Sequence, residues 1–217
     1  MATMGLDSES ISVTDAYGHA WERLWAHFLP LMLIAIAYAA VTLVAGGIQR
    51  ILPGIVGFAV QVFVVGPISF GASFAVLRAA RGQDPNLADL LVPFERSFVQ
   101  AALGYLLFVV TLTVGFALLI VPGIFLAVRL AFVPFLIVDE NLDAISAFRE
   151  SWRRTAAYPW QIFGAMALAI PILCVGLLLL GVGILPAGAL VNLAIATLFL
   201  DVTREVGREA PLHSTID

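Results

Sequence analysis

Two long runs without a charged residue constrain this chain more than any other feature of its sequence. Residues 97–128 and 155–200 contain no Asp, Glu, Lys or Arg, over 32 and 46 positions. A helix of 32 residues is roughly 48 Å long at 1.5 Å per residue, whereas the hydrocarbon core of a bilayer is about 30 Å thick. Each run therefore predicts two membrane crossings joined by a corner.

The rest of the chain completes six predicted spans. Residues 28–48 and 55–77 are uncharged, and a Leu52-Pro53-Gly54 turn separates them. Val121-Pro122-Gly123 is the expected corner between the third and fourth spans, and the fourth span is expected to end at Val138. Residues 181–188 are the expected corner between the last two spans. The composition agrees, because 12% charged and 61% hydrophobic residues are far from the roughly 25% charged residues of soluble domains.

The arginines predict the orientation. Nine of them would lie on one side of the membrane and only Arg50 on the other, with Arg129 inside a span. The nine are Arg23, Arg78, Arg81, Arg96, Arg149, Arg153, Arg154, Arg204 and Arg208. By the positive-inside rule, both termini are expected in the cytoplasm.

The chain also shows a threefold internal repeat. Each unit would contain a cytoplasmic amphipathic helix, a span, a proline-containing corner and a second span, over residues of about 12–81, 87–140 and 143–205. The prediction is a single all-α membrane domain over residues 12–208, with three helical hairpins, a disordered N-terminus at 1–11 and a flexible tail at 209–217. Parallel repeats imply an axis near the membrane normal, unlike the inverted repeats of many transporters.

One strongly polar residue lies at a similar depth in the second span of each unit. Gln61, Arg129 and Asn192 follow the corner prolines by eight, seven and six residues. A charge at the position of Arg129 costs at least ~2.5 kcal/mol, and no acidic residue is expected at its depth. Three interpretations stay open, which are a hydrogen-bonded lock between helices, a site for an anionic headgroup or carboxylate, and an ion pathway.

The predicted amphipathic helices are expected to contact the membrane surface. Trp21, Trp25 and Trp152 suit the headgroup level, where tryptophan is enriched. Arg149, Arg153 and Arg154 suit anionic lipid headgroups. Asp139 to Asp143 are expected to cap the last of these helices, since carboxylates favour a helix N-terminus.

No motif predicts a metal, a cofactor or a catalytic centre. Asp139, Asn141, Asp143 and Glu150 have EF-hand spacing, but the required glycine is Ala144. His19 and His27 lack a third ligand and an HExxH motif. The net charge of −4 gives no electrostatic signal for nucleic acid.

The central stretch, VPGIFLAVRLAFVPFLIVDENLDAISAFRESWRRT, resembles a group of bacterial membrane proteins that includes the membrane domain of glycerophosphodiester phosphodiesterases and allied uncharacterised families. The similarity depends on Pro122, Gly123, Val-Asp-Glu at 138–140, Ala144, and Ser151 to Arg153. In the phosphodiesterases, the resemblance implies a membrane domain fused to a soluble catalytic barrel. The six spans leave no room for a barrel here, so that activity is not carried over.

Together these patterns predict a multi-pass protein of a bacterial cytoplasmic membrane without catalytic activity. It is expected to bind membrane lipids, a partner membrane protein or a second copy of itself through its cytoplasmic amphipathic helices. The alternative is a transporter or channel for an ion, lipid or small molecule, with Gln61, Arg129 and Asn192 as its polar cluster. An intramembrane enzyme is the third interpretation.

Overall fold

The computed structural model describes residues 13–52, 54–178 and 183–209, and these residues contain helices and turns but no strand. The elements are α1 (Val13–Ala26), α2 (Phe28–Ile51), α3 (Ile55–Val60), a π-helical turn η1 (Gln61–Val65), α4 (Gly66–Ala80), a 3₁₀ helix η2 (Leu87–Leu91), α5 (Val92–Arg96), α6 (Phe98–Leu118), α7 (Ile120–Arg129), α8 (Val133–Asp139), α9 (Ala144–Ala157), α10 (Pro159–Leu178) and α11 (Ile184–Glu209). The expected disordered N-terminus at 1–11 lies outside the described residues, as does the expected flexible tail at 209–217 except for Glu209, which is the last residue of α11.

Six helical segments are long and apolar enough to cross a membrane, which confirms the predicted number of spans. They are Phe28–Ile51, Ile55–Ala80, Phe98–Leu118, Ile120–Asp139, Pro159–Leu178 and Ile184–Val206. Only 17–44% of the most apolar window of each span is buried within the protein. The remaining apolar surface needs an apolar solvent, as in a multi-pass membrane protein.

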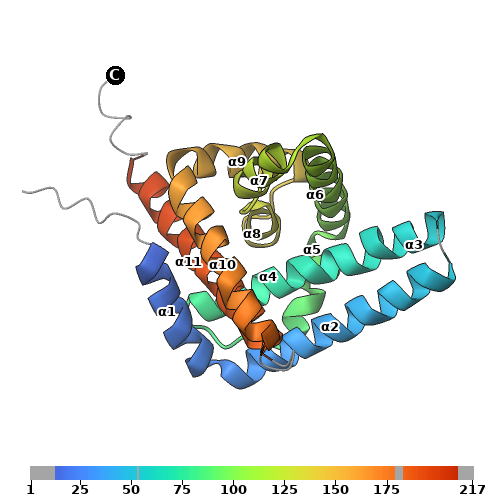
Figure 1. The fold of residues 1–217 in the computed structure, drawn as a ribbon, viewed down its shortest axis with the longest axis horizontal. Helices are drawn as coiled ribbons and strands as arrows, with labels where there is room; N and C mark the ends of the chain where they lie inside the picture. The colour runs from blue at the N-terminus through green and yellow to red at the C-terminus, as the bar shows by residue number, and fades with distance from the viewer. Residues whose placement is uncertain (1–12, 53, 179–182, 210–217) are drawn as a thin grey trace, which may run out of the picture.

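The first corner agrees with its prediction as far as it is described. Helix α2 ends at Ile51, and α3 begins at Ile55 after Gly54. Gly54 has a φ of +85°, a left-handed conformation that glycine adopts without a steric penalty. Pro53 lies outside the described residues. The α2 hairpin, which α2 and α3 form, extends well away from the other helices (Figure 1).

The other two corners differ from the predictions. The break between α6 and α7 is Leu119, whose extended backbone has φ −168° and ψ 156°. Pro122 lies inside the first turn of α7, where its missing N–H has no intrahelical acceptor to lose. Pro186 likewise lies in the first turn of α11, which begins at Ile184. The expected corner at 181–188 was therefore wrong for its second half, and residues 179–182 are not described.

The fourth span is broken, although its hydropathy predicted one continuous helix. Helix α7 ends at Arg129 and α8 begins at Val133. Pro134 explains the break, because a proline ring clashes with the carbonyl four residues earlier, here that of Leu130, and cannot donate to it. Pro67 follows the π-helical turn η1, which relieves the same conflict within the second span.

The short helix α8 is the centre of the protein. Figure 1 shows it nearly end on, with α9 crossing the top of the view. Its side chains are buried from Val133 to Val138 except at Pro134. Phe135 and Phe132 both pack on Phe199 of α11, with ring centroids 5.3 and 5.4 Å apart. An apolar helix buried on all sides in this way fixes the surrounding spans against one another.

The segments that precede the spans are not alike. Helices α1 and α9 each have 14 residues, and each buries one face. The expected second amphipathic segment, 87–98, is instead split into η2 and α5 and interrupted at Ser97. Asp89 of η2 is buried and paired with Arg78 at 2.6 Å. The threefold repeat stays a prediction.

Candidate functional site

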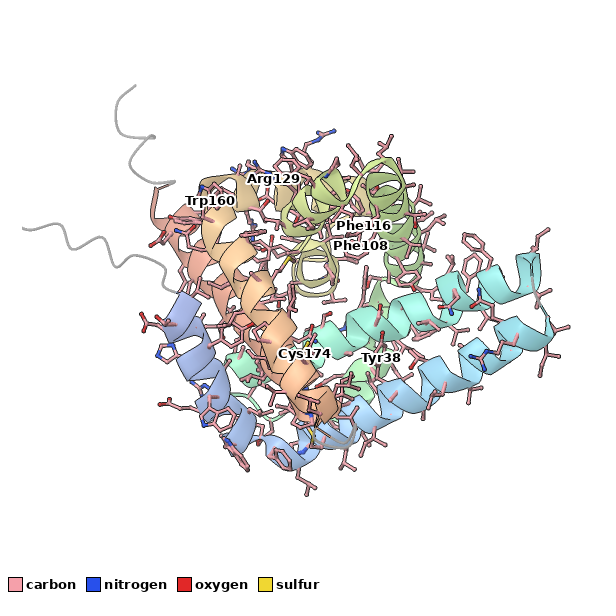
Figure 2. All side chains as sticks on the ribbon, viewed as in Figure 1. Tyr38, Phe108, Phe116, Arg129, Trp160 and Cys174 are labelled. Atoms are coloured by element: carbon pink, nitrogen blue, oxygen red, sulfur yellow. The ribbon has the colours of Figure 1, made fainter. Side chains whose placement is uncertain are left out.

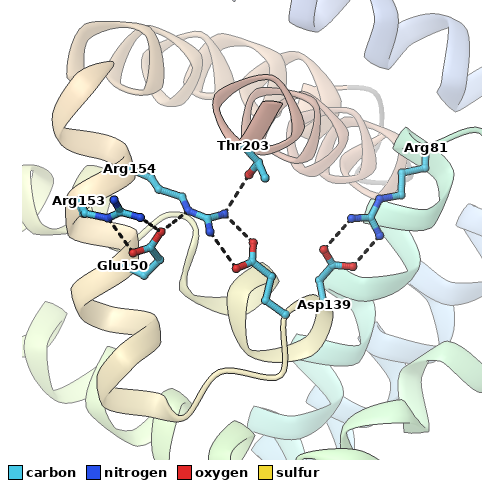
Figure 3. Close-up of polar contacts among 7 residues, drawn as sticks. Arg81, Asp139, Glu150, Arg153, Arg154 and Thr203 are labelled. Atoms are coloured by element: carbon cyan, nitrogen blue, oxygen red, sulfur yellow. Dashed lines mark hydrogen bonds and ion pairs between the residues drawn. The ribbon is translucent and has the colours of Figure 1, made fainter. Parts of the chain in front are cut away.

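Arg154 of α9 is the centre of a buried network of ionic hydrogen bonds (Figure 3). Its guanidinium donates two hydrogen bonds to Glu140, at 2.6 and 2.8 Å, and one to Glu150 at 2.6 Å. Its Nη1 also donates to Thr203 of α11 at 3.0 Å. The side chain is only 10% exposed. One arginine therefore joins α9, the end of α8 and α11.

The neighbouring carboxylate has a separate cation. Asp139 accepts two hydrogen bonds from Arg81 at the end of α4, both 2.6 Å long. The hydrogen bonds to Asp139 raise the pKa of Arg81, although partial burial opposes them. Asp139 and Glu140 are adjacent in sequence, but they tie the end of α8 to two different helices. These two neighbouring carboxylates thus connect the end of α8 to Arg81 at the end of α4 and to Arg154 of α9.

Asp143 is the true N-cap of α9. Its side chain accepts a hydrogen bond from the Ser146 N–H at 3.0 Å. Hydrogen bonding from the Ser146 side chain, and then from the Ser146 backbone N–H, holds the pKa of Asp143 below its ordinary value. The expectation that Asp139 to Asp143 cap this helix is confirmed for Asp143, whereas Asp139 pairs with Arg81 instead.

Helix α9 also caps the break in the fourth span. The Ser151 hydroxyl donates to the carbonyl of Arg129 at 2.8 Å and accepts from the Phe132 N–H at 3.3 Å. The Thr155 hydroxyl lies 3.2 Å from the same carbonyl, but its single proton has a shorter contact, of 2.8 Å, with the Ser151 carbonyl. Backbone groups freed inside a membrane span must find partners within the protein. The Ser151 hydroxyl supplies both partners, and the Thr155 hydroxyl lies one helical turn further along beside the same carbonyl. The spacing of these residues along the chain did not predict this role.

The side chain of Arg129 has aromatic neighbours but no hydrogen-bond acceptor. Its guanidinium carbon lies 5.0 Å from the ring centroid of Phe125 and 5.3 Å from that of Trp152. Its Nε and Nη1 are enclosed, and among the described residues neither has a hydrogen-bond partner. No carboxylate forms an ion pair with it in that part of the chain.

The three polar residues predicted to converge have different environments. Gln61 donates to Gln49 of α2 at 3.1 Å, whereas Asn192 donates to the Gly188 carbonyl of its own helix at 2.9 Å. Figure 2 shows Arg129 beside α9, far from Tyr38 on the α2 hairpin. No hydrogen bond described in the structure joins any two of the three.

A cavity of about 570 Å³ lies between the spans. Its walls come mainly from α2, α4 and α11, with Tyr105 and Phe108 from α6, and they include Asn192 but neither Gln61 nor Arg129. Asn192 therefore lies at this cavity, whereas Arg129 lies at the end of α7 against Trp152 of α9.

The residues expected at the membrane surface fall into two groups. Trp21, Trp25 and Trp152 are exposed, at 53%, 59% and 42%. Arg149 and Arg153 are also exposed, and Arg153 pairs with Glu150 of the same helix at 2.7 Å. Arg154 was wrongly assigned to lipid headgroups, because it is buried and its donors are used within the protein.

No group of three His, Cys, Asp or Glu residues suited to a metal ion occurs among the described residues. His27, between α1 and α2, lies 3.4 Å from the Asp84 carboxylate, and His19 of α1 is exposed.

A family model described as a domain of unknown function, DUF7847, matches residues 56–207, which is well over half of the chain. No solved structure matches the chain. The family match starts within α3 and includes α9, Arg129 and the ionic network of Arg154. The expected relation to phosphodiesterase membrane domains stays a prediction.

Proposed function

Because the chain belongs to the DUF7847 family, whose function is unknown, we propose from its own geometry that it is a non-catalytic membrane protein that binds an anionic phospholipid. We place the site at Arg129 and the exposed face of α9, on the cytoplasmic side of a bacterial cytoplasmic membrane. The observation that carries the proposal is the guanidinium of Arg129, for which the described residues provide no acceptor.

The energetics of Arg129 favour an external anion. A charge within a membrane span costs at least ~2.5 kcal/mol. The rings of Phe125 and Trp152 recover part of this, since a cation–π contact contributes about 0.5–2 kcal/mol. Nε and Nη1 are enclosed without an acceptor among the described residues, so a phosphate reaches them only when neighbouring side chains move aside. Each hydrogen bond that it then accepts from the charged group contributes about 1.5–3 kcal/mol. A phosphate also fits the planar fork of arginine, which can donate two parallel hydrogen bonds.

The surroundings of Arg129 suit a headgroup rather than a free solute. Trp152 is exposed and contacts Arg129. Arg149 lies one turn before Trp152, on the same face of α9, and is exposed. Tryptophan and arginine at the headgroup level anchor helices to anionic leaflets, with about 1 kcal/mol for each basic residue near the surface. We therefore infer that α9 acts as an amphipathic surface helix.

The proposed orientation is supported by contacts that gather the arginine-rich segments on one side. Arg154 donates to Thr203 near the end of α11, and Tyr158 donates to Glu205. An even number of spans places both termini on the same side. A Gln83→Cys variant, made with Cys174→Ser because Cys174 is exposed, should react with a thiol reagent only from the cytoplasm. Reaction from the periplasm alone would overturn the orientation.

The absence of catalysis is proposed because the main carboxylates are used structurally. Asp89, Asp139, Glu140 and Glu150 each accept a short hydrogen bond from an arginine. The hydrogen bonds from Arg153 and Arg154 also lower the pKa of Glu150, so that its carboxylate is a poor proton acceptor near neutral pH.

Native mass spectrometry in mild detergent tests the lipid site. With added phosphatidylglycerol, the wild type should retain the lipid, Arg129→Leu should lose it, and Arg129→Lys should retain less because it lacks the fork. Phosphatidylcholine should not be retained by any of them. Arg50→Leu is the matched control, since Arg50 is exposed at the far end of α2. Equal retention of phosphatidylglycerol by Arg129→Leu would refute the site, and a co-purifying protein lost in that variant would favour a partner instead.

A further inference from the structure

The cavity between the spans is separate from the surface of α9. Each of the six candidate spans contributes at least one residue to its walls. The smallest contributions are Pro134 of α8 and Leu173 of α10. Its volume of about 570 Å³ is within the range of roughly 300–1,000 Å³ for small-molecule sites.

The chemistry of the walls excludes a charged occupant. None of the described residues that line the cavity is Asp, Glu, Lys, Arg or His. Most are aliphatic or aromatic, including Leu31, Ile34, Phe70 and Phe108. A charge placed there would be desolvated without a partner, which is unfavourable by several kcal/mol or more. The occupant must therefore be mostly hydrocarbon and uncharged.

A few polar groups on the walls still lack partners. The hydroxyls of Ser69 and Ser73 donate to carbonyls of their own helix. The phenol groups of Tyr38 and Tyr105, in contrast, have no hydrogen bond to another described residue, and the oxygen of the exposed Asn192 amide accepts none. Polar groups without partners in a membrane interior are costly, so a ligand that hydrogen-bonds to them is stabilised.

We propose that this cavity binds an uncharged single-chain lipid that has a hydroxyl head, such as a long-chain alcohol or a monoacylglycerol. The hydrocarbon chain lies between the apolar walls, and the hydroxyl meets Tyr38, Tyr105 and Asn192. This site is independent of the phosphate site at Arg129, which contributes nothing to these walls.

Gly188→Leu tests the proposal because it fills the cavity. Gly188 lines the cavity, and a Cβ atom built there meets nothing within 4 Å. Gly47→Leu is the matched control, since a Cβ at Gly47 also meets nothing within 4 Å and Gly47 does not line the cavity. Ala39→Leu closes the cavity from α2 and gives a second, independent variant in case Gly188→Leu does not fold.

The probe is a long-chain alcohol that carries a diazirine and an alkyne, used with the full chain in nanodiscs. We expect labelling of peptides from α2 and α11 that excess unlabelled alcohol suppresses. The labelling should be lost in Gly188→Leu and in Ala39→Leu, and unchanged in Gly47→Leu and in Arg129→Leu. Asn192→Leu should bind the probe roughly fivefold more weakly, because one hydrogen bond is removed.

Two results would overturn the proposal. One is labelling that excess alcohol does not suppress or that Gly188→Leu and Ala39→Leu retain, since the probe would then be reporting only the lipid-facing surface. The other is equal competition by an ionised long-chain sulfonate, since a cavity without a cation should reject it.

Discussion

Replacing Arg154 with methionine should destabilise the fold by about 2–3 kcal/mol. Arg154 donates four hydrogen bonds, to Glu140, Glu150 and Thr203. In the variant, Glu150 keeps its hydrogen bonds from Arg153. Glu140 keeps none, because in the described part of the chain its side chain hydrogen-bonds only to Arg154.

The magnitude follows from the burial of these groups. Removing one partner from a buried ion pair costs about 3–5 kcal/mol, because the other charge is left without compensation. The Glu140 side chain is 28% exposed, so water can solvate part of its charge and the expected loss falls below that range. Arg154→Lys should lie between the wild type and Arg154→Met, since lysine keeps the charge but cannot donate two parallel hydrogen bonds.

The assay is unfolding of the purified protein by denaturant in detergent, followed by tryptophan fluorescence. Arg153→Met is the matched control: its side chain is 67% exposed and forms its ion pair with Glu150 of the same helix, so the loss should be below about 1 kcal/mol. A free energy of unfolding for Arg154→Met within error of the value for Arg153→Met would show that the network does not hold α8, α9 and α11 together.

Three further results are expected when unfolding of the purified protein is measured with denaturant, with heat and as a function of pH. Gly71→Ala should be strongly destabilising, because its Cβ would collide with the Leu90 carbonyl. Gly47→Ala, with open space around it, should be neutral or stabilising by up to about 1 kcal/mol. Equal effects of the two substitutions would contradict the close packing of α4 on η2. Asp143→Ala should lower the thermal midpoint by about 2–4 °C through loss of the N-cap, and Asp143→Asn should restore it; no change in the alanine variant would exclude a stabilising cap. The hydrogen bonds from Arg153 and Arg154 hold the pKa of Glu150 below its ordinary value of 4.5. The stability that ionised Glu150 provides should therefore be complete above pH 4.5. It should disappear as the pH falls through the lower pKa of Glu150 in the folded state. Glu150→Gln should remove this acid-dependent step, and an unchanged pH profile would refute the linkage.

The six spans could be predicted because hydropathy is a local property of the chain. A run such as 155–200 cannot be solvated by water whatever its neighbours are, and its length sets the number of crossings. The N-cap at Asp143 is equally local, since its hydrogen bond reaches only to Ser146. Pro134 favours the break in the fourth span, but the apolar sequence on both sides of it predicts one continuous helix.

The tertiary structure alone decided which charges are buried and which polar groups meet. Arg153 and Arg154 are adjacent in sequence and look alike, yet one faces solvent and the other donates to Glu140 and to Thr203, 49 residues away. Gln61, Arg129 and Asn192 follow similar spacing, yet their neighbours differ. Gln61 donates to Gln49, Arg129 lies against aromatic rings, and Asn192 donates to a carbonyl of its own helix. Ion pairs and cavities depend on how helices pack across long separations in the chain, and periodicity within one helix carries no information about that packing.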